Sequence, residues 1–350
     1  MNELSRRQFF KTSGVIAGVS FATAKTTTAR QEEELPEITL TCADYLRLTP
    51  LATGDLTPKN VNLRLVRGPR SEMLRRALSD PEVSGGETSM LGHLLRVDQG
   101  DRSHVAIPVF PLRNFTARDF YTLKGSSLEP IRLNGSRVGI YNWTASGAVW
   151  YRQLVRYFGQ DPAAMKWVVG GADQPAQVQA RVPLPPYVTN APSDKSLSDL
   201  LIEGELDAIF VPLPPRKFHP VEGPIVRLVP DFRAVEKIYF EKTQCYPTQH
   251  VIVLRKEIWE RDPSVGRRLL DTFQQCEAQF QEGLHHFPYS TPWEIAEVEE
   301  TDLSMGPEFH AHGLEENHRE VDVFCQGGFD DGQTKRRITV EEYFAEFLKG

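Results

Sequence analysis

The sequence predicts an α/β fold with two lobes, each a mainly parallel sheet flanked by helices. The chain of 350 residues is long enough for two lobes of about 100–200 residues each. Strand patterns alternate with helix patterns along it, which favours parallel strands covered by helices. With 40% hydrophobic and 25% charged residues, the composition is that of a folded protein and excludes a fibre or a disordered tail.

The first block alternates strands and helices from the start. Residues 38–42 are apolar enough for a strand, and 61–66 alternate apolar and polar side chains, which predicts a strand with one covered face. Helical spacing predicts a helix over 71–79 and a second one that Glu87 opens and that runs through Leu95. Residues 104–110 follow as an apolar strand.

One stretch of the second block predicts a binding site. Residues 137–141 form a short strand pattern, Asn142, Thr144 and Ser146 are turn or cap residues, and 148–157 have helical spacing. A strand that leads directly into a helix leaves unpaired N–H groups at the helix start, and these favour an anion such as a carboxylate. The alternative is an ordinary turn in which Thr144 or Ser146 is the N-cap.

The remaining elements continue the same alternation. The chain shows no internal repeat and no low-complexity run. The predicted elements are strands at 166–171, 205–210 and 250–254, helices at 197–203 and 263–283, an irregular Pro-rich passage at 181–193, and a last helix capped by Thr339 with Glu342.

The N-terminus matches a twin-arginine export signal. Ser5–Lys11 reads SRRQFFK, a modest apolar segment follows at 12–24, and Ala22–Ala24 is a small-x-small cleavage site. We expect export by the twin-arginine machinery, removal of residues 1–24, and a soluble protein in the periplasm or otherwise outside the cytoplasm. The alternative is an amphipathic helix with an incidental arginine pair.

Charge and cysteine content exclude some partners. Cleavage would remove three basic residues and one acidic residue, so the formal net charge changes from −7 to −9. An acidic chain with scattered basic residues argues against a nucleic-acid partner. The four cysteines are far apart and show no C-x-x-C pair, so a disulfide is permitted in this compartment but not required.

The order and spacing of several separated stretches resemble the 4,5-dihydroxyphthalate decarboxylase family from about Ile38 to about Phe344. Each stretch is weak alone. They are Asp44-Tyr45, Glu87-Thr88-Ser89, Ile107 to Arg113, Val138-Gly139 through Thr144, Ala148-Val149-Trp150, Gly204 to Ala208, Pro230 to Glu236, Tyr246-Pro247 with His250, Met305-Gly306, and Gly313-Leu314-Glu315.

The chain also departs from this family. Leu46 replaces a residue that is usually polar, and the helix expected after Val83 begins with Gly85-Gly86. The decarboxylase acts inside the cell, whereas this chain has an export signal.

The resemblance implies the type II periplasmic-binding-protein architecture, with two chain crossings and the ligand in the cleft between the lobes. The N-terminal pattern and this resemblance together predict five segments. They are the signal peptide at 1–24, a linker at 25–37, the first part of lobe 1 at 38–124, lobe 2 at 125–224, and a return to lobe 1 with C-terminal helices at 225–350.

Such a decarboxylase must protonate the ring carbon that carries the leaving carboxylate. A hydroxyl para to that carbon supplies electron density, so no cofactor is predicted. A buried Glu with a raised pKa, or a His, can donate the proton, and Glu87 and His250 are the candidates. Alternatively, Glu87 is a helix-start residue that favours the dipole, and His250 is a core histidine.

The ligand's other groups need binding residues. Arg113 suits bidentate binding of one carboxylate, and the N–H groups after Thr144 suit a second. Arg113 could instead form a structural bridge with Asp119 or Glu236. Three further residues could orient ring hydroxyls, or simply cap and pack: Asp44, Tyr45 and Ser89.

Histidines cluster late in the chain. His285-His286 are expected in a surface loop, and His310-Ala311-His312 with His318 form a second group. A metal site needs a third well-placed ligand, which the sequence does not show, so no metal site is predicted.

Two functions from different classes fit the sequence, and the enzyme is favoured. The first is a cofactor-independent decarboxylase of a hydroxylated aromatic carboxylate. The second is a receptor that captures an aromatic or other organic carboxylate for a membrane permease, without chemistry. The fold serves both and cannot decide. An exported protein that has lost activity is a third reading.

Overall fold

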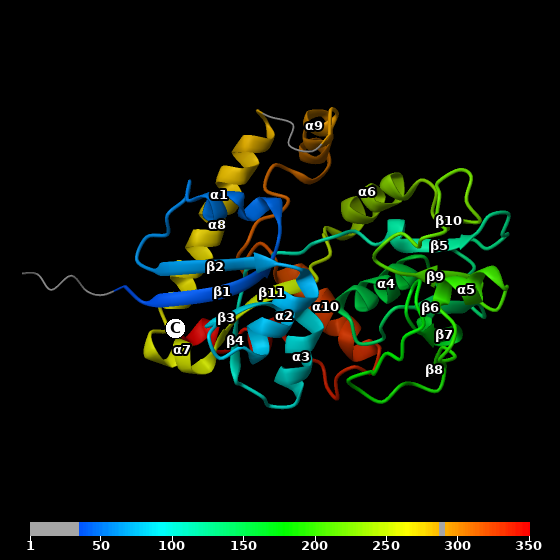
Figure 1. The fold of residues 1–350 in the computed structure, drawn as a ribbon, viewed down its shortest axis with the longest axis horizontal. Helices are drawn as coiled ribbons and strands as arrows, with labels where there is room; N and C mark the ends of the chain where they lie inside the picture. Colours follow the sequence, from blue (N-terminus) through cyan, green and yellow to red (C-terminus); the bar gives the residue numbers. More distant parts are fainter. Residues whose placement is uncertain (1–34, 287–290) are drawn as a thin grey trace, which may run out of the picture. The chain divides into compact units, whose positions relative to one another are not determined.

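The computed structural model describes residues 35–286 and 291–350, and these form two sheets flanked by helices (Figure 1). The export signal expected at 1–24 lies outside the described residues. Among the described helices, none is both long enough and apolar enough to cross a membrane.

The first sheet has five strands in the order β2-β1-β3-β11-β4. β1 is parallel to β2 and β3, and β11 is antiparallel to both β3 and β4. One strand, contributed late in the chain, therefore runs against the other four. The strands are β1 (Glu37–Ala43), β2 (Asn62–Gly68), β3 (Gly85–Ser89), β4 (His104–Ile107) and β11 (His250–Arg255).

The second sheet has six strands in the order β10-β5-β9-β6-β7-β8. β6, β7, β8 and β9 are parallel neighbours, and β5 is antiparallel to β9 and β10. The mainly parallel two-lobed α/β prediction is thus confirmed. The strands are β5 (Phe120–Leu123), β6 (Arg137–Ile140), β7 (Lys166–Val169), β8 (Val188–Asn190), β9 (Ala208–Phe210) and β10 (Ile225–Arg227).

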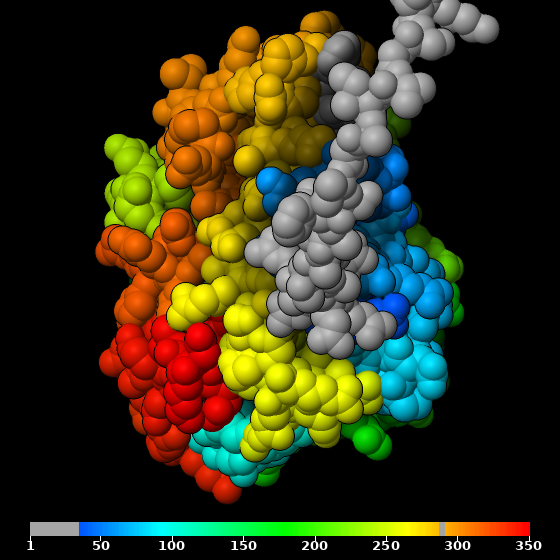
Figure 2. Space-filling view, turned by 90° about the vertical axis from the view of Figure 1, so that its left-hand side faces the viewer, coloured from blue at the N-terminus to red at the C-terminus, as the bar shows by residue number. Residues whose placement is uncertain are grey.

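The observed helices agree closely with the predicted ranges where the helical spacing of apolar side chains is sustained over many residues. The Thr339–Glu342 capping box is present at the start of α11. The helices are α1 (Thr49–Thr53), α2 (Arg70–Ser79), α3 (Met90–Asp98), α4 (Ser146–Tyr157), α5 (Leu197–Ile202), α6 (Phe232–Thr243), α7 (Lys256–Arg261), α8 (Val265–Leu284), α9 (Glu294–Met305), α10 (His318–Asp330) and α11 (Val340–Tyr343). Figure 2 shows a face made largely by the yellow-to-red C-terminal segments, beside the blue and cyan segments of the first sheet.

The second sheet takes in more of the chain than the expected boundaries at 125 and 224 allow. β5 lies before residue 125 and β10 lies after residue 224, yet both pair within this sheet. The chain therefore crosses between the sheets in the segments 108–119 and 228–249.

α4 is buried between two hydrophobic cores. Val149 and Trp150 pack in the core of the first sheet, whereas Tyr151 and Leu154 pack in the core of the second. The Trp150 indole N–H also donates to the Thr248 carbonyl, at 2.6 Å, just before β11. This helix therefore fixes the second lobe against the first.

A buried ion pair adds to this junction. Arg152 of α4 donates to Asp331 at the end of α10, at 2.5 Å, and the two side chains are 0% and 1% exposed. Arg156 reaches the other carboxylate oxygen at 2.6 Å but is 28% exposed. The Arg152 guanidinium also lies over the Trp143 ring.

Glu87 lies in a strand, which corrects the prediction that it opens a helix. β3 spans Gly85–Ser89 and the helix begins only at Met90. A side chain at Gly85 or Gly86 would collide with the backbone oxygens of Val253 and Thr41 on the flanking strands. The two glycines therefore allow the backbones of the flanking strands to pack closely against β3.

His93 in α3 makes stability depend on pH. Burial lowers its pKa from 6.5 to about 4, against the opposing effect of the Tyr343 carbonyl. Between these values only the unfolded chain holds a proton there. His93 therefore does not reduce the free energy of unfolding above pH 6.5. As the pH falls from 6.5 to about 4, the free energy of unfolding decreases by up to about 1.4 kcal/mol per pH unit, because the unfolded chain takes up one proton more than the folded chain.

His93→Gln should reduce the dependence of the free energy of unfolding on pH by the amount due to one proton. Urea unfolding at pH 7.5, 6 and 5 measures this dependence. His219→Gln, a change at an exposed histidine, should leave the slope unchanged. A slope that is the same in wild type and His93→Gln would contradict the prediction.

Candidate active site

Glu87 is the centre of a buried hydrogen-bonded group at the end of the first sheet. Its Oε1 pairs with His250 Nδ1 and accepts the Tyr45 hydroxyl at 2.6 Å. Its Oε2 accepts the Ala43 N–H at 2.7 Å and the Cys42 thiol at 3.4 Å. The Glu87 side chain is 0% exposed and that of His250 is 10% exposed.

The strand register explains why these side chains meet. β1 and β11 flank β3 on either side, and in the antiparallel pair His250 is opposite Ser89 while Ile252 is opposite Glu87. Cross-strand partners, and residues two apart on one strand, share a face of the sheet. Glu87, Ser89 and His250 therefore lie on one face although they come from distant parts of the chain.

The group holds Glu87 as a carboxylate. Burial alone would raise its pKa, but His250, the Tyr45 hydroxyl and the Ala43 N–H together lower the pKa below its ordinary 4.5. Burial and the nearby Glu87 charge raise the pKa of the Tyr45 hydroxyl and of the Cys42 thiol. The raised pKa that the sequence analysis allowed for Glu87 is therefore wrong, and Glu87 is an acceptor rather than an acid.

His250 uses only one of its two ring nitrogens within this group. Its Nδ1 is bonded to Glu87, and no described residue forms a hydrogen bond with its Nε2. A carboxylate on one ring nitrogen fixes the tautomer and leaves the other nitrogen for a ligand.

The starts of two helices meet beside this group, one from each lobe. The Ser89 hydroxyl at the N-cap of α3 lies 2.7 Å from the Ser146 hydroxyl of α4. Ser146 also accepts the Leu91 N–H at 3.1 Å. Among the described residues, no acceptor bonds the backbone N–H groups of Ser146 and Gly147 at the start of α4.

Other polar groups face the start of α4. A Cβ at Gly147 would lie 2.7 Å from the Tyr141 hydroxyl and 3.4 Å from Gln249 Oε1. Gln249 directly precedes His250, so the start of α4 and the Glu87–His250 pair are neighbours. The glycine in the first turn of the helix was the available signal for this close approach, and the sequence analysis did not use it.

Arg181 was also missed. It lies in the Pro-rich passage, and its backbone N–H donates to the Thr144 hydroxyl at 3.3 Å. Its guanidinium lies against the first turn of α3, because a Cβ at Gly92 would be 2.6 Å from Arg181 Nη1. A cation beside the positive end of a helix is unfavourable unless an anion is shared between them. No described carboxylate pairs with Arg181.

Arg113 does not contact the Glu87–His250 pair. Its guanidinium donates to the Ala311 carbonyl at 2.8 Å and to the Asn317 side chain. It is 7% exposed, and burial lowers its pKa to about 10. In this structure Arg113 holds the loop before α10, and it forms an ion pair with neither Asp119 nor Glu236.

Asp44 and Thr144 are likewise used elsewhere. The Asp44 side chain is 67% exposed and pairs with Arg67 at 2.7 Å. The Thr144 hydroxyl donates to Asn142 Oδ1 at 3.1 Å. Thr144 does not cap α4, because the N-cap residue of that helix is Ala145. Of the seven proposed site residues, the structure brings Tyr45, Glu87, Ser89 and His250 together.

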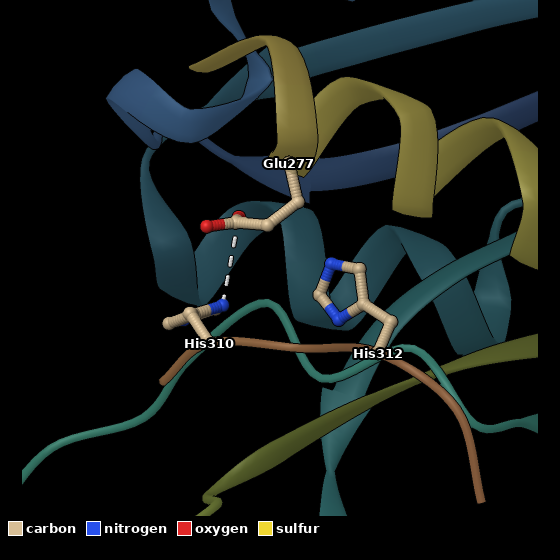
Figure 3. Close-up of side chains that lie close together, drawn as sticks. All are labelled: Glu277, His310 and His312. Atoms are coloured by element: carbon tan, nitrogen blue, oxygen red, sulfur yellow. Dashed lines mark ion pairs between the residues drawn. The ribbon is translucent and has the colours of Figure 1, made fainter. Parts of the chain in front are cut away.

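The late histidines divide into two groups. His285 lies at the end of α8 and is 42% exposed, and His318 is 53% exposed. His310 and His312 are buried, and Glu277 of α8 lies beside them (Figure 3). Glu277 is therefore a third side chain of a metal-binding type beside the two histidines, and the sequence alone did not place it there.

No protein-family model matches the chain. The chain is 24% identical over 316 residues to a 4,5-dihydroxyphthalate decarboxylase from Comamonas testosteroni, covering 88% of this chain and 96% of that protein. It is 27% identical to a 4,5-dihydroxyphthalate decarboxylase from Pseudomonas putida, covering 52% of this chain and 72% of that protein.

A solved structure establishes the architecture. The periplasmic aliphatic sulphonate binding protein SsuA from Escherichia coli matches with a TM-score of 0.50 at 12% identity, over 88% of this chain and 91% of that one. The chain therefore has the fold of a periplasmic binding protein and is similar in sequence to 4,5-dihydroxyphthalate decarboxylases over most of its length.

Proposed function

We propose that the protein is a cofactor-independent decarboxylase of a hydroxylated aromatic dicarboxylate resembling 4,5-dihydroxyphthalate. The observation that carries this proposal is the buried Glu87–His250 pair, which lies next to two helix starts that favour an anion. The similarity to proteins named as that decarboxylase supports the same substrate class.

The reaction exchanges a carboxylate for a proton. His250 acts as an imidazolium: its Nδ1–H is held by the Glu87 carboxylate, and its Nε2–H donates the proton to the ring carbon. The bond between that carbon and the carboxylate then breaks, and its electron pair restores the aromatic ring as CO₂ leaves and His250 becomes neutral. A ring hydroxyl para to this carbon supplies the electron density for protonation. Solvent then returns a proton to His250, so no redox step is required.

The retained carboxylate would bind at the start of α4. The N–H groups of Ser146 and Gly147 offer two donors there, and the Ser89 and Ser146 hydroxyls offer two more. Arg181 would add a charge-assisted bond. A ligand here replaces the Ser89–Ser146 hydrogen bond, so the contact between the lobes opens for binding.

A second hollow, of about 410 Å³, is also lined by Tyr45 but suits this ligand less well. Its lining includes three carboxylates, those of Asp44, Glu294 and Glu297, and a single arginine, Arg47. Asp44 and Glu297 are paired with Arg67 and Arg233, but ionised carboxylates are acceptors only and offer a dicarboxylate no hydrogen-bond donor.

The decisive experiment is incubation of the purified protein with 4,5-dihydroxyphthalate, with CO₂ and the aromatic product measured over time. Release of one CO₂ per product formed supports the proposal. Calorimetric binding of the unaltered acid, with no product after hours, would instead support a receptor.

The receptor is the second candidate because the fold match is to a binding protein. In that case the same site would hold the acid for a membrane permease. Export by the twin-arginine pathway is part of either proposal, and cell fractionation of the full chain against a variant with Arg6 and Arg7 replaced by Lys would test it.

Arg181→Gln should raise KM by about 10- to 100-fold and change kcat little, because one charge-assisted hydrogen bond to the retained carboxylate is worth about 1.5–3 kcal/mol. Arg216→Gln, a change at another exposed arginine of the second lobe, is the matched control and should leave KM unchanged. Equal effects of the two changes would exclude a specific role for Arg181.

A further inference from the structure

Three buried donor side chains converge outside the site described above. Glu277 comes from α8, and His310 and His312 come from the loop that precedes α10; they are 6%, 2% and 5% exposed. One potential ligand atom from each lies within 4.8 Å of the other two. Figure 3 shows the carboxylate above the two imidazole rings.

Two of these donors face each other without a hydrogen bond. His310 Nδ1 is buried without a partner and lies 3.6 Å from Glu277 Oε2. The other carboxylate oxygen, Oε1, already accepts Arg47 at 2.5 Å and Gln281 at 2.8 Å. A buried nitrogen with a lone pair beside a free carboxylate oxygen is left unsatisfied by the protein, and a cation between them would satisfy both.

The space around the donors fits a single ion. An enclosed cavity of about 10 Å³, lined by all three side chains together with Tyr45 and Arg47, has room for about one water-sized occupant. The same three side chains also line a hollow of about 450 Å³, which provides an access route.

The imidazoles are in the form that binds metals. Burial, together with the charges of Arg47 and Arg113, lowers the pKa of His310 far below 6.5 and that of His312 to about 3. Both rings are neutral at pH 7, and neutral imidazole is the ligating species.

We propose that Glu277, His310 and His312 bind one divalent transition-metal ion, with zinc as the representative ion. Two histidines and one carboxylate are a donor set typical of zinc sites that keep a fourth position open. The fourth position would hold a water from the hollow of about 450 Å³ that the same three side chains line.

Binding requires the three ligand atoms, now within 4.8 Å of one another, to move closer together, and it requires one hydrogen bond to be given up. The Phe110 N–H donates to His312 Nδ1 at 3.3 Å, so ligation through Nε2 needs the proton on Nδ1 and gives up this hydrogen bond. The bond is at the long end of the usual range, and three metal–ligand bonds replace it.

The ion would also be close to the Glu87–His250 pair. Tyr45 lines the small cavity and its hydroxyl donates to Glu87. An ion bound there would therefore act on the proposed proton donor, His250, through Tyr45 and Glu87. The site itself does not depend on the proposed reaction.

The test uses the untagged full chain, stripped with a chelator, dialysed and titrated with Co²⁺. We expect one ion per chain, visible absorption of the intensity typical of four-coordinate cobalt, and loss of this absorption when Zn²⁺ is added. Glu277→Gln and His310→Ala should each weaken Co²⁺ binding by more than the 10- to 100-fold typical of changes to residues that only support ligands.

His285→Ala and His318→Ala are the matched controls, because both histidines are exposed and lie outside the three donors. They should leave the stoichiometry and the spectrum unchanged. Circular dichroism checks that each variant is folded. If the His310 variant does not fold, the wild-type spectrum and stoichiometry decide.

The proposal is overturned if the wild type takes up no cobalt, gives only the weak spectrum of six-coordinate surface binding, or binds equally well in Glu277→Gln.

Discussion

Glu87→Gln should lower kcat by about 100- to 10 000-fold, the range lost when a general acid is no longer positioned and charged correctly. Gln has nearly the same shape, but it removes the negative charge that His250 Nδ1 contacts. The amide NH₂ of Gln would also face the Ala43 N–H or the Tyr45 hydroxyl, and each of these donors needs an acceptor. Binding should weaken far less, because Glu87 is placed to act through His250 and not on the substrate.

The two effects can be separated by measurement. Turnover is followed as CO₂ release, and affinity is measured by calorimetry with phthalate, which keeps both carboxylates but lacks the ring hydroxyls needed for reaction. The Kd for phthalate should change by less than about tenfold, or 1.4 kcal/mol. The pH profile of kcat should also change, which a purely structural defect would not produce.

Asp44→Asn is the control, since Asp44 is the nearest carboxylate in sequence to Tyr45 and is exposed. It should change kcat by less than about twofold, in keeping with a surface pair worth about 0–1 kcal/mol. A folded Glu87→Gln protein that keeps more than a tenth of wild-type kcat would remove Glu87 from the mechanism.

Asp331→Ala should destabilise the protein by about 3–5 kcal/mol, the usual loss when one partner of a buried ion pair is removed. Asp331 is the carboxylate bound by Arg152, and both side chains are essentially unexposed. After the change, the Arg152 guanidinium stays buried over Trp143 with only a long bond to the Trp143 carbonyl. Arg156, being partly exposed, can turn to solvent.

Urea unfolding measures this loss through the transition midpoint. Asp322→Ala is the matched control on α10, because Asp322 pairs with Arg337 at 2.6 Å but both are 40% exposed or more. We expect less than about 1 kcal/mol there. Similar losses in the two variants would show that the Arg152–Asp331 pair is not the buried connection between the lobes.

The sequence could predict the elements whose signal is local. The long helix expected at 263–283 is α8 at Val265–Leu284, and the strand expected at 38–42 lies within β1. In these segments the period of apolar side chains is sustained, so local pattern and tertiary burial agree.

The same local signal failed at Glu87. Gly85-Gly86 were expected at the start of a helix, but they lie in β3, where neighbouring backbones approach them closely. The role of a glycine depends on what packs against it, and that information is not local.

The sequence by itself determined the two-lobed α/β class and singled out Glu87 and His250 as proton-transfer candidates. Only the tertiary structure decided that these residues, 163 positions apart, touch, because the antiparallel return of β11 places them on one face. It also decided that Arg113 holds a loop and that Glu277 meets His310 and His312. Such contacts depend on which segments pack together, and the identity of a single side chain does not carry that information.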